Sequence, residues 1–311
     1  MKALITGSEG FVGSYLRREL EHSGYDVLGL DLRAGAGTVK ADLLDAAELA
    51  AIVGGERPDT VFHLAGQADV GLSWKDPAGT FERNVIASTN LLDAVRTSAP
   101  GARVVIVGSS DQYGDPGDAG KAISEETPLR PVSPYAVSKT AQELMAKTYA
   151  KAYGMNVVMT RSFNHCGAGQ RKGFIISDFA SGIAEIENGR TDCLRIGNLD
   201  STRDFTHVSD VVRAYRLLAE KGRNGEVYNV GSGCAHTGKE ILETFLSMSA
   251  AEIRIEKDPL RMRPSDVPVI CCDNGKLRRD TGWKPEVSFK DMLRDVLDFW
   301  RRGEKTDNRT I

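Results

Sequence analysis

The feature that most constrains the fold of this 311-residue chain is a regular alternation of short apolar segments with longer helical patterns. The apolar segments are rich in Val, Ile and Leu and occupy residues 2–6, 26–30, 60–64, 103–107 and 156–160. Such segments are typical of strands buried on both faces, and the stretches between them carry apolar residues at helical spacing. This alternation predicts a doubly wound parallel α/β sheet with right-handed crossovers.

The second half of the chain has a looser order of elements. Helical patterns continue to the C-terminal region, covering residues 80–96, 134–153, 173–188, 209–220, 238–248 and 288–301, and further short strands are expected at residues 193–196, 226–230 and 252–256. We therefore predict a first domain at residues 1–163 and a smaller C-terminal α/β lobe at residues 164–311, with some return of the chain to the first domain.

Composition and charge exclude several classes of protein. With 41% hydrophobic and 27% charged residues, the chain has the composition of an ordinary globular protein. Its net charge of −3 gives no electrostatic attraction to nucleic acid or to an anionic membrane. No segment approaches the ~18 apolar residues of a membrane span, and the apolar run at residues 3–5 is too short for a signal peptide, so we expect a cytoplasmic protein. The five cysteines form no CxxC pair, so neither a disulfide framework nor a metal site is expected.

Three glycines spaced three residues apart, Gly7, Gly10 and Gly13, follow the first predicted strand and open a helical pattern. Glycines in this place permit a tight turn, close approach of the backbone to a pyrophosphate, and close helix-on-strand packing. A plain strand-to-helix turn is the alternative. Asp31 favours the first interpretation, because a carboxylate at the end of the second strand accepts the hydroxyls of an adenosine ribose. The pattern therefore predicts a dinucleotide site.

The residues after the second strand bear on the choice between NAD(H) and NADP(H). Asp31 repels a 2′-phosphate, whereas the Arg33 guanidinium, two residues on, is able to bind one. NAD(H) is therefore favoured and NADP(H) stays open. Asp42 and Leu43 are candidates for the adenine side of the site, although an Asp in this position is as often a helix N-cap.

A tyrosine and a lysine four residues apart, Tyr135 and Lys139, stand at the start of a helical pattern and share one face of it. A free tyrosine has a pKa near ~10, and a neighbouring ammonium lowers it, so the pair makes a usable acid or base. The same spacing also occurs on ordinary amphipathic helices. Ser109 favours the catalytic interpretation, because it follows a predicted strand at the edge where open α/β sheets place their chemistry.

Several segments of the chain resemble the extended short-chain dehydrogenases/reductases that act on nucleotide sugars. The shared features are residues 6–13 (TGSEGFVG), residues 63–66 (HLAG), Ser109 and the Tyr135/Lys139 pair. Later segments are similar to the GDP-sugar branch, which holds the GDP-mannose 4,6-dehydratases and the GDP-4-keto-6-deoxy-mannose reductases: residues 161–170 (RSFNHCGAGQ), 197–205 (GNLDSTRDF) and 263–268 (RPSDVP). The resemblance covers essentially the whole chain and implies a Rossmann domain followed by a lobe that binds a nucleotide sugar.

The resemblance also implies roles for individual residues. Tyr135 would be the acid/base, Lys139 would hold the nicotinamide ribose, and Ser109 would hold the sugar oxygen, with Asp111 beside them. The residues implied to contact the cofactor are Gly7, Gly10, Phe11, Val12, Gly13, Asp31, Leu32, Arg33, Asp42, Leu43, Leu64, Ala65, Gly66, Asn84, Tyr135 and Lys139. Those implied to contact a GDP-sugar substrate are Ser110, Asn164, Arg203, Arg263 and Asp266. No metal is implied, and the family often forms a homodimer through the helices near residues 80–96 and 134–153.

The resemblance leaves the reaction to be chosen. In the 4,6-dehydratases of this family a Thr-x-Glu arrangement supplies the glutamate that removes the C5 proton, whereas this chain has Ser109 and the shorter Asp111. We therefore expect a reductase of a C4 ketone, which needs a hydride and one proton from Tyr135. A GDP-mannose 4,6-dehydratase and a nucleotide-sugar 4-epimerase stay open as alternatives. A catalytically silent dinucleotide sensor is disfavoured, because it has no reason to keep Ser109, Tyr135 and Lys139 together.

Overall fold

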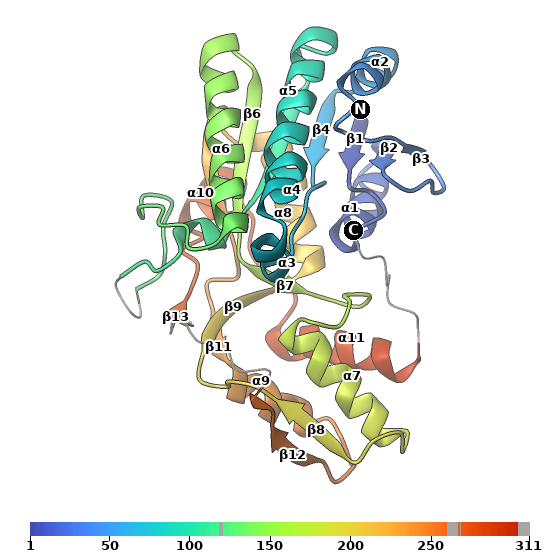
Figure 1. Cartoon of the computed structure of the whole chain (residues 1–311), viewed down its shortest axis with the longest axis vertical. Helices are drawn as coiled ribbons and strands as arrows, with labels where there is room; N and C mark the ends of the chain where they lie inside the picture. Colours follow the sequence, from blue (N-terminus) through green and yellow to red (C-terminus); the bar gives the residue numbers. More distant parts are fainter. Residues whose placement is uncertain (118–120, 260–266, 268, 304–311) are drawn as a thin grey trace.

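The structure is a computed structural model that describes residues 1–117, 121–259, 267 and 269–303. It consists of a larger sheet domain and a smaller lobe, which lies below the sheet in Figure 1. Arg263 and Asp266, two of the predicted substrate contacts, lie outside the described residues.

The larger part is built on a seven-stranded sheet in which every neighbouring pair is parallel, in the order β10-β6-β5-β4-β1-β2-β3 (Figure 1). Its strands are β1 (Lys2–Thr6), β2 (Asp26–Asp31), β3 (Thr38–Lys40), β4 (Thr60–His63), β5 (Arg103–Ser109), β6 (Asn156–Ser162) and β10 (Val227–Val230). The predicted parallel α/β sheet is confirmed, and all five strands expected in the first half are present. The pattern did not predict β3, a three-residue edge strand that is largely exposed.

The strand predicted at residues 226–230 belongs to the large sheet and not to the lobe, where the order of elements had placed it. β10 pairs with β6 from Val227 opposite Met159 to Val230 opposite Ser162, and all four of its residues are buried. The helix before it, α8 (Val208–Lys221), packs on the same sheet. The chain after residue 163 therefore returns to the first domain, because the apolar strand β10 and the apolar face of α8 are buried there.

Helices cover both faces of the sheet, and alternate residues of β1, β2, β4, β5 and β6 contribute to the two cores. On one face Leu4 packs with α2 (Ala46–Glu56), α5 (Ala87–Ser98) and α6 (Pro134–Tyr153). On the other face Ala3 and Ile5 pack with α1 (Phe11–His22), α8 and α10 (Gly275–Thr281). This two-sided burial explains why the strands are apolar without polar alternation.

The lobe has its own small sheets and its own core. One sheet has β9 (Thr202–His207) beside β7 (Asn164–Cys166), β11 (Ala235–Thr237) and β13 (Val269–Ile270), and β8 (Cys193–Ile196) pairs with β12 (Arg254–Lys257). Strands β7, β8 and β9 pack with α7 (Ile175–Glu187), α9 (Gly238–Leu246) and α11 (Phe289–Arg301) through a separate apolar cluster.

The helix expected at residues 80–96 is divided into three parts. After α3 (Val70–Lys75), the chain forms α4 (Pro77–Phe81), one turn of π-helix, η1 (Glu82–Ile86), and then α5. The π turn contains the buried Asn84, one of the predicted cofactor residues. Single π turns of this kind are often found at functional sites.

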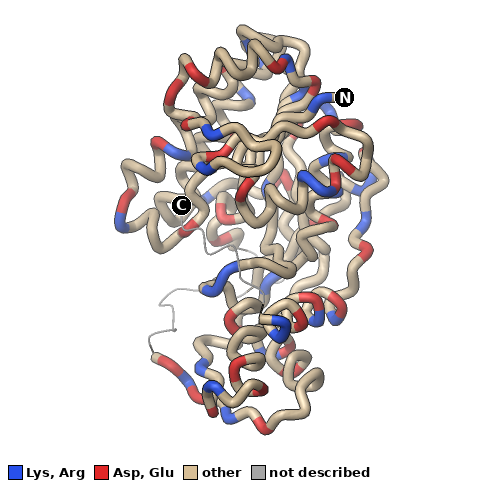
Figure 2. Tube along the Cα trace, turned by 90° about the vertical axis from the view of Figure 1, so that its right-hand side faces the viewer, with Lys and Arg blue, Asp and Glu red and all other residues tan. Residues whose placement is uncertain are grey.

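Lys and Arg are interspersed with Asp and Glu over both parts of the molecule (Figure 2), in keeping with the small net charge of −3. Within the described ranges, none of the helices combines the length and the apolar character needed to cross a bilayer.

Candidate active site

The N-terminal turn of α6 brings Tyr135 and Lys139 to the centre of the sheet. The Ser133 hydroxyl accepts a hydrogen bond from the N–H of Ala136 at 3.1 Å, and Pro134 occupies the first helical position, so the helix starts at a defined residue. Tyr135 and Lys139 then lie one turn apart, and both are buried. The predicted shared face is confirmed.

Ser109 ends β5 and begins the short 3₁₀ helix η2 (Ser110–Tyr113). Its hydroxyl accepts the N–H of Asp111 at 3.2 Å and also hydrogen-bonds Tyr135. Burial raises the pKa of Tyr135 well above its usual value and the negative charge of Asp111 adds to this, while the Ser109 hydrogen bond acts in the opposite direction. Ser109, Asp111 and Tyr135 are therefore brought together as predicted.

The surroundings of Lys139 differ from the sequence-based expectation. Its ammonium donates hydrogen bonds to the carbonyl oxygen of Val107 at 2.9 Å and to Oε1 of Gln142 at 3.0 Å. Burial lowers the pKa of Lys139 to about 8. The expectation that Lys139 depresses the pKa of Tyr135 is wrong for this arrangement, because desolvation dominates and the net shift of the phenol is upward.

The glycine-rich turn fits a dinucleotide. Gly7 has φ +73°, and a side chain there would lie 2.9 Å from the backbone nitrogen of Ala65, while a side chain at Gly13 would collide with the Gly7 carbonyl. These glycines bring α1 close to β1 and place Leu64 and Ala65 beside the turn. Helix α1 begins at Phe11, followed by Val12, and no side chain among the described residues caps its first turn. The backbone N–H groups of this turn are therefore suited to binding a diphosphate.

Asp31 lies at the end of β2, where an adenosine ribose is expected. One carboxylate oxygen accepts the N–H of Glu9 at 3.0 Å, and the other accepts the backbone N–H and Nε of Arg33 at 3.2 and 3.4 Å. Leu32 between them is half exposed. Asp42 accepts the N–H of Leu44 and is not the cap of α2, whose N-cap is Asp45.

Asn84 braces the loop that follows β4. Its Oδ1 accepts the N–H of Gln67 at 2.7 Å, and its Nδ2 donates to the Gln67 carbonyl at 3.0 Å and to Ser138 Oγ at 2.9 Å. Gly66 passes directly over this amide, since a side chain there would contact Asn84 Oδ1 at 2.6 Å. The Asn84 side chain therefore fixes the loop at Gly66 and Gln67, beside the predicted cofactor site.

The predicted substrate residues in the described ranges come from both parts of the chain. Ser110 is buried at the start of η2. Asn164 is exposed at the start of β7, two residues after Ser162, which pairs with Ser109 in the large sheet. Arg203 lies on β9, where its guanidinium donates to the carbonyl of Val267 at 2.8 Å.

Two buried glutamines at this site, Gln112 and Gln142, were not predicted from the sequence. Gln112 binds Ser109 through a capping box, and Gln142 binds Lys139. The spacing of Gln142 from Lys139, three residues along one helix, was a usable signal, whereas Gln112 offered only a polar residue after Asp111. His63 is buried, and both of its ring nitrogens are hydrogen-bonded, to Thr6 and Ser88.

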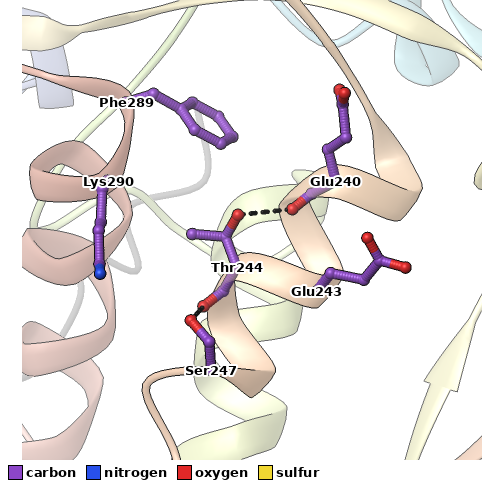
Figure 3. A pocket seen from close by; sticks show the side chains of 6 residues that line it. All are labelled: Glu240, Glu243, Thr244, Ser247, Phe289 and Lys290. Atoms are coloured by element: carbon purple, nitrogen blue, oxygen red, sulfur yellow. Dashed lines mark hydrogen bonds between the residues drawn. The ribbon is translucent and has the colours of Figure 1, made fainter.

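A separate hollow of about 430 Å³ lies in the lobe (Figure 3). Its lining comes from α9, the C-cap of that helix and the first turn of α11: Glu240, Glu243, Thr244, Ser247, Phe289 and Lys290. The predicted catalytic residues lie instead on β5, η2 and α6. In the described part of the chain, no three His, Cys, Asp or Glu side chains are grouped in a way that suits a metal ion.

The family model described as GDP-mannose 4,6 dehydratase matches residues 4–296. The chain belongs to this family. It is 35% identical to a GDP-6-deoxy-D-mannose reductase of Pseudomonas aeruginosa over 302 residues, which cover 96% of this chain and 97% of that protein. The resemblance noted in the sequence is therefore confirmed over nearly the whole chain.

Solved structures show the same similarity in three dimensions. RMD from Pseudomonas aeruginosa complexed with NADPH matches this fold with a TM-score of 0.89 and 34% identity, covering 97% of this chain and 99% of that one. A UDP-glucose 4-epimerase from Thermus thermophilus in complex with NAD matches with a TM-score of 0.86 and 29% identity, covering 97% and 99%. The arrangement of the large sheet and the lobe is shared with enzymes of both kinds.

Proposed function

We propose that this chain is an NAD(P)H-dependent reductase of the C4 ketone of a GDP-4-keto-6-deoxy-hexose, giving a GDP-6-deoxyhexose of the rhamnose type. The observation that carries the proposal is the buried Tyr135 hydroxyl bound to Ser109 at the carboxyl end of β5. The similarity to a GDP-6-deoxy-D-mannose reductase supports the choice of substrate class.

Ser109, Tyr135 and Lys139 would each have a separate role in the reduction. A reduced nicotinamide, when bound, supplies a hydride to the ketone carbon. Ser109 would hydrogen-bond the C4 oxygen, and Tyr135 would give that oxygen its proton as the carbonyl becomes an alcohol. Lys139, buried on the same helix face, would hold the nicotinamide ribose with its ammonium.

A phenol is protonated at neutral pH, so Tyr135 is able to supply the proton that the reduction of a ketone requires. The preference for reduction over dehydration rests on Asp111, which is one methylene shorter than the glutamate of the dehydratases and less suited to removing a C5 proton.

The test is a set of incubations with the purified protein, followed by absorbance of the reduced nicotinamide and by chromatography of the sugar nucleotides. With GDP-4-keto-6-deoxy-mannose and NADH or NADPH, we expect one reduced nicotinamide to be consumed for each alcohol formed. Conversion of GDP-mannose to a 4-keto product without net change in cofactor would establish the dehydratase alternative. Interconversion of C4 epimers of a UDP-sugar would establish the epimerase alternative.

We further propose that two copies associate through α6 and the π turn beside it. Val137 and Leu144, two helical turns apart on α6, are 40% and 55% exposed, and Ile86 in η1 is 50% exposed. Exposed apolar side chains on adjacent helices favour a protein interface.

We also propose a cytoplasmic location. Its support is the five free cysteines, which are typical of a reducing compartment.

A further inference from the structure

Gln142 holds the ammonium of Lys139, and neither the family resemblance nor the proposed reaction gives this glutamine a role. Gln142 lies one turn after Lys139 on α6 and is 1% exposed. Its Oε1 is one of the two hydrogen-bond acceptors of Lys139, the other being the carbonyl of Val107 on β5. One acceptor therefore belongs to the sheet and the other to the helix, so the pair fixes the ammonium between them.

The contacts behind Gln142 determine which way its amide points. Nε2 donates to Ser88 Oγ on α5 at 2.6 Å, which leaves Oε1 to face Lys139. Ser88 donates its own proton to the carbonyl of Asn84 at 2.6 Å, so its oxygen is free to accept from Gln142. A flipped amide would place its NH₂ group against a cation, and therefore Lys139 and Ser88 select the same orientation.

The orientation of the Ser88 hydroxyl also determines the tautomer of His63. Because Ser88 Oγ gives its proton to Asn84, it accepts from Nε2 of His63 at 2.7 Å, and Nδ1 of His63 then accepts from Thr6 Oγ1 at 2.8 Å. Burial, with a smaller effect from the charge of Lys139, lowers the pKa of His63 to about 3, so the ring is neutral in this tautomer. A directed chain of buried hydrogen bonds thus runs from β1 and β4 to Lys139.

We propose that Gln142 is a positioning residue for Lys139, supported by Ser88 and His63, and that it sets the place and the charge of the ammonium that meets the nicotinamide ribose. The proposal rests on the proposed function, since it requires Lys139 to act at the cofactor. A neutral amide suits this task. A carboxylate at the same position would form an ion pair and draw the ammonium toward α5.

Two substitutions at Gln142 test the proposal, because they are expected to shift the pKa of Lys139 in opposite directions. Gln142→Leu removes the acceptor at nearly constant volume, so the dissociation constant of the reduced cofactor, measured by its fluorescence, is expected to rise about tenfold. Activity that needs the ammonium is lost as the pH rises through the pKa of Lys139. We expect this alkaline limb of the kcat/KM profile to move down by about one pH unit in Gln142→Leu and to move up in Gln142→Glu.

Other titratable groups near Lys139 must be separated from this effect. They are His63 on β4, Tyr135 on α6 itself, Asp111 at η2, and Glu143, whose carboxylate is bound by Arg161. Gln142 hydrogen-bonds Lys139 and Ser88. Gln142→Leu adds no charge, so a downward move of the limb in this variant identifies the group as Lys139, whereas the charge of Gln142→Glu would raise the pKa of Tyr135 as well. Ser88→Ala should move the limb in the direction of Gln142→Leu by a smaller amount.

A matched control is Thr281→Val on α10, which removes two other buried hydrogen bonds, one donated by Thr281 Oγ1 to the Leu277 carbonyl and one accepted by it from the N–H of Trp283. It is expected to lower the melting temperature without moving the pH limb or the cofactor affinity. If Gln142→Leu changes only the melting temperature, or if both Gln142 variants move the limb in one direction, the proposal is wrong.

A variant of Lys139 itself distinguishes a failure of the proposed function from a failure of the role proposed for Gln142. Lys139→Met is expected to abolish reduction and weaken cofactor binding. If Lys139→Met retains activity, then the role of Lys139 itself is wrong, whatever Gln142 does. If Lys139→Met is inactive while Gln142→Leu is unchanged in pH profile and affinity, only the role of Gln142 is overturned.

Discussion

The amide of Gln112 donates a 2.7 Å hydrogen bond to the carboxylate of Glu143, and this contact joins the end of β5 to the helix that carries Tyr135. Gln112 Oε1 accepts the N–H of Ser109 at 2.9 Å. Glu143 is also bound by Arg161 of β6, through Nε at 2.8 Å and Nη2 at 2.7 Å. The distance between Ser109 and Tyr135 thus depends on a buried ion pair that takes no part in the chemistry.

Glu143→Gln is expected to destabilise the protein by about 3–5 kcal/mol, because it leaves the buried guanidinium of Arg161 without a counter-charge. Urea unfolding followed by circular dichroism measures this change. A double variant, Glu143→Leu with Arg161→Met, should recover much of the loss. A loss below about 1 kcal/mol in Glu143→Gln would contradict the importance of the pair.

The stability of the protein is expected to depend on pH through the carboxylate of Glu143. Burial alone would raise the pKa of Glu143, but the hydrogen bonds and charges of Arg161 and Lys147 outweigh it, and the pKa lies below its usual value. This stabilisation is present above the pKa of an unfolded glutamate, near ~4.3, and is lost as the pH falls through the lower folded pKa. The difference in unfolding free energy between wild type and Glu143→Gln should therefore shrink below about pH 4.

Tyr135→Phe is expected to reduce kcat by at least ~10²-fold, because only the transferable proton is removed. The ring stays in place, so binding of the reduced cofactor, measured by fluorescence, should change little. Activity within about tenfold of wild type would rule out Tyr135 as the proton donor.

The cofactor preference should follow the balance between Asp31 and Arg33. We expect the wild-type protein to use NADH at least as well as NADPH, because Asp31 would face the ribose of the bound cofactor and already binds Arg33. Asp31→Asn should raise kcat/KM for NADPH relative to NADH by about tenfold, since it removes the repulsion and releases the guanidinium. A strong preference of the wild type for NADPH would show that Arg33 outweighs Asp31.

Leu144→Glu places a charge on the exposed apolar face of α6 and is expected to convert the proposed homodimer to monomers. Light scattering coupled to size-exclusion chromatography gives the mass directly. Lys151→Glu, a charge change near the C-terminal end of the same helix, serves as the control. A wild-type protein that is already monomeric would refute the proposed interface.

The sequence by itself determined the parallel sheet and the Tyr135/Lys139 pair. A strand buried on both faces must be a continuous apolar run, and four residues make about one helical turn, so both features are encoded within a few neighbouring positions. The helix-on-strand contact at Gly13 is local in the same way, because Gly13 lies against Gly7 and Ser8, whereas Gly7 lies against the backbone of Leu64 and Ala65 in the loop after β4. The family resemblance of the segments that contain these features then predicted the function.

Only the tertiary structure decided which distant residues support that pair. Gln112 on η2 and Glu143 on α6 are 31 residues apart. Ser88 and Gln142 are 54 residues apart, on α5 and α6, which meet because both pack on the same face of the sheet. Strand β10 likewise joined β6 across more than 60 residues. Apolar periodicity specifies which face of an element is buried but not which partner buries it, and buried polar side chains take their hydrogen-bond partners from that packing.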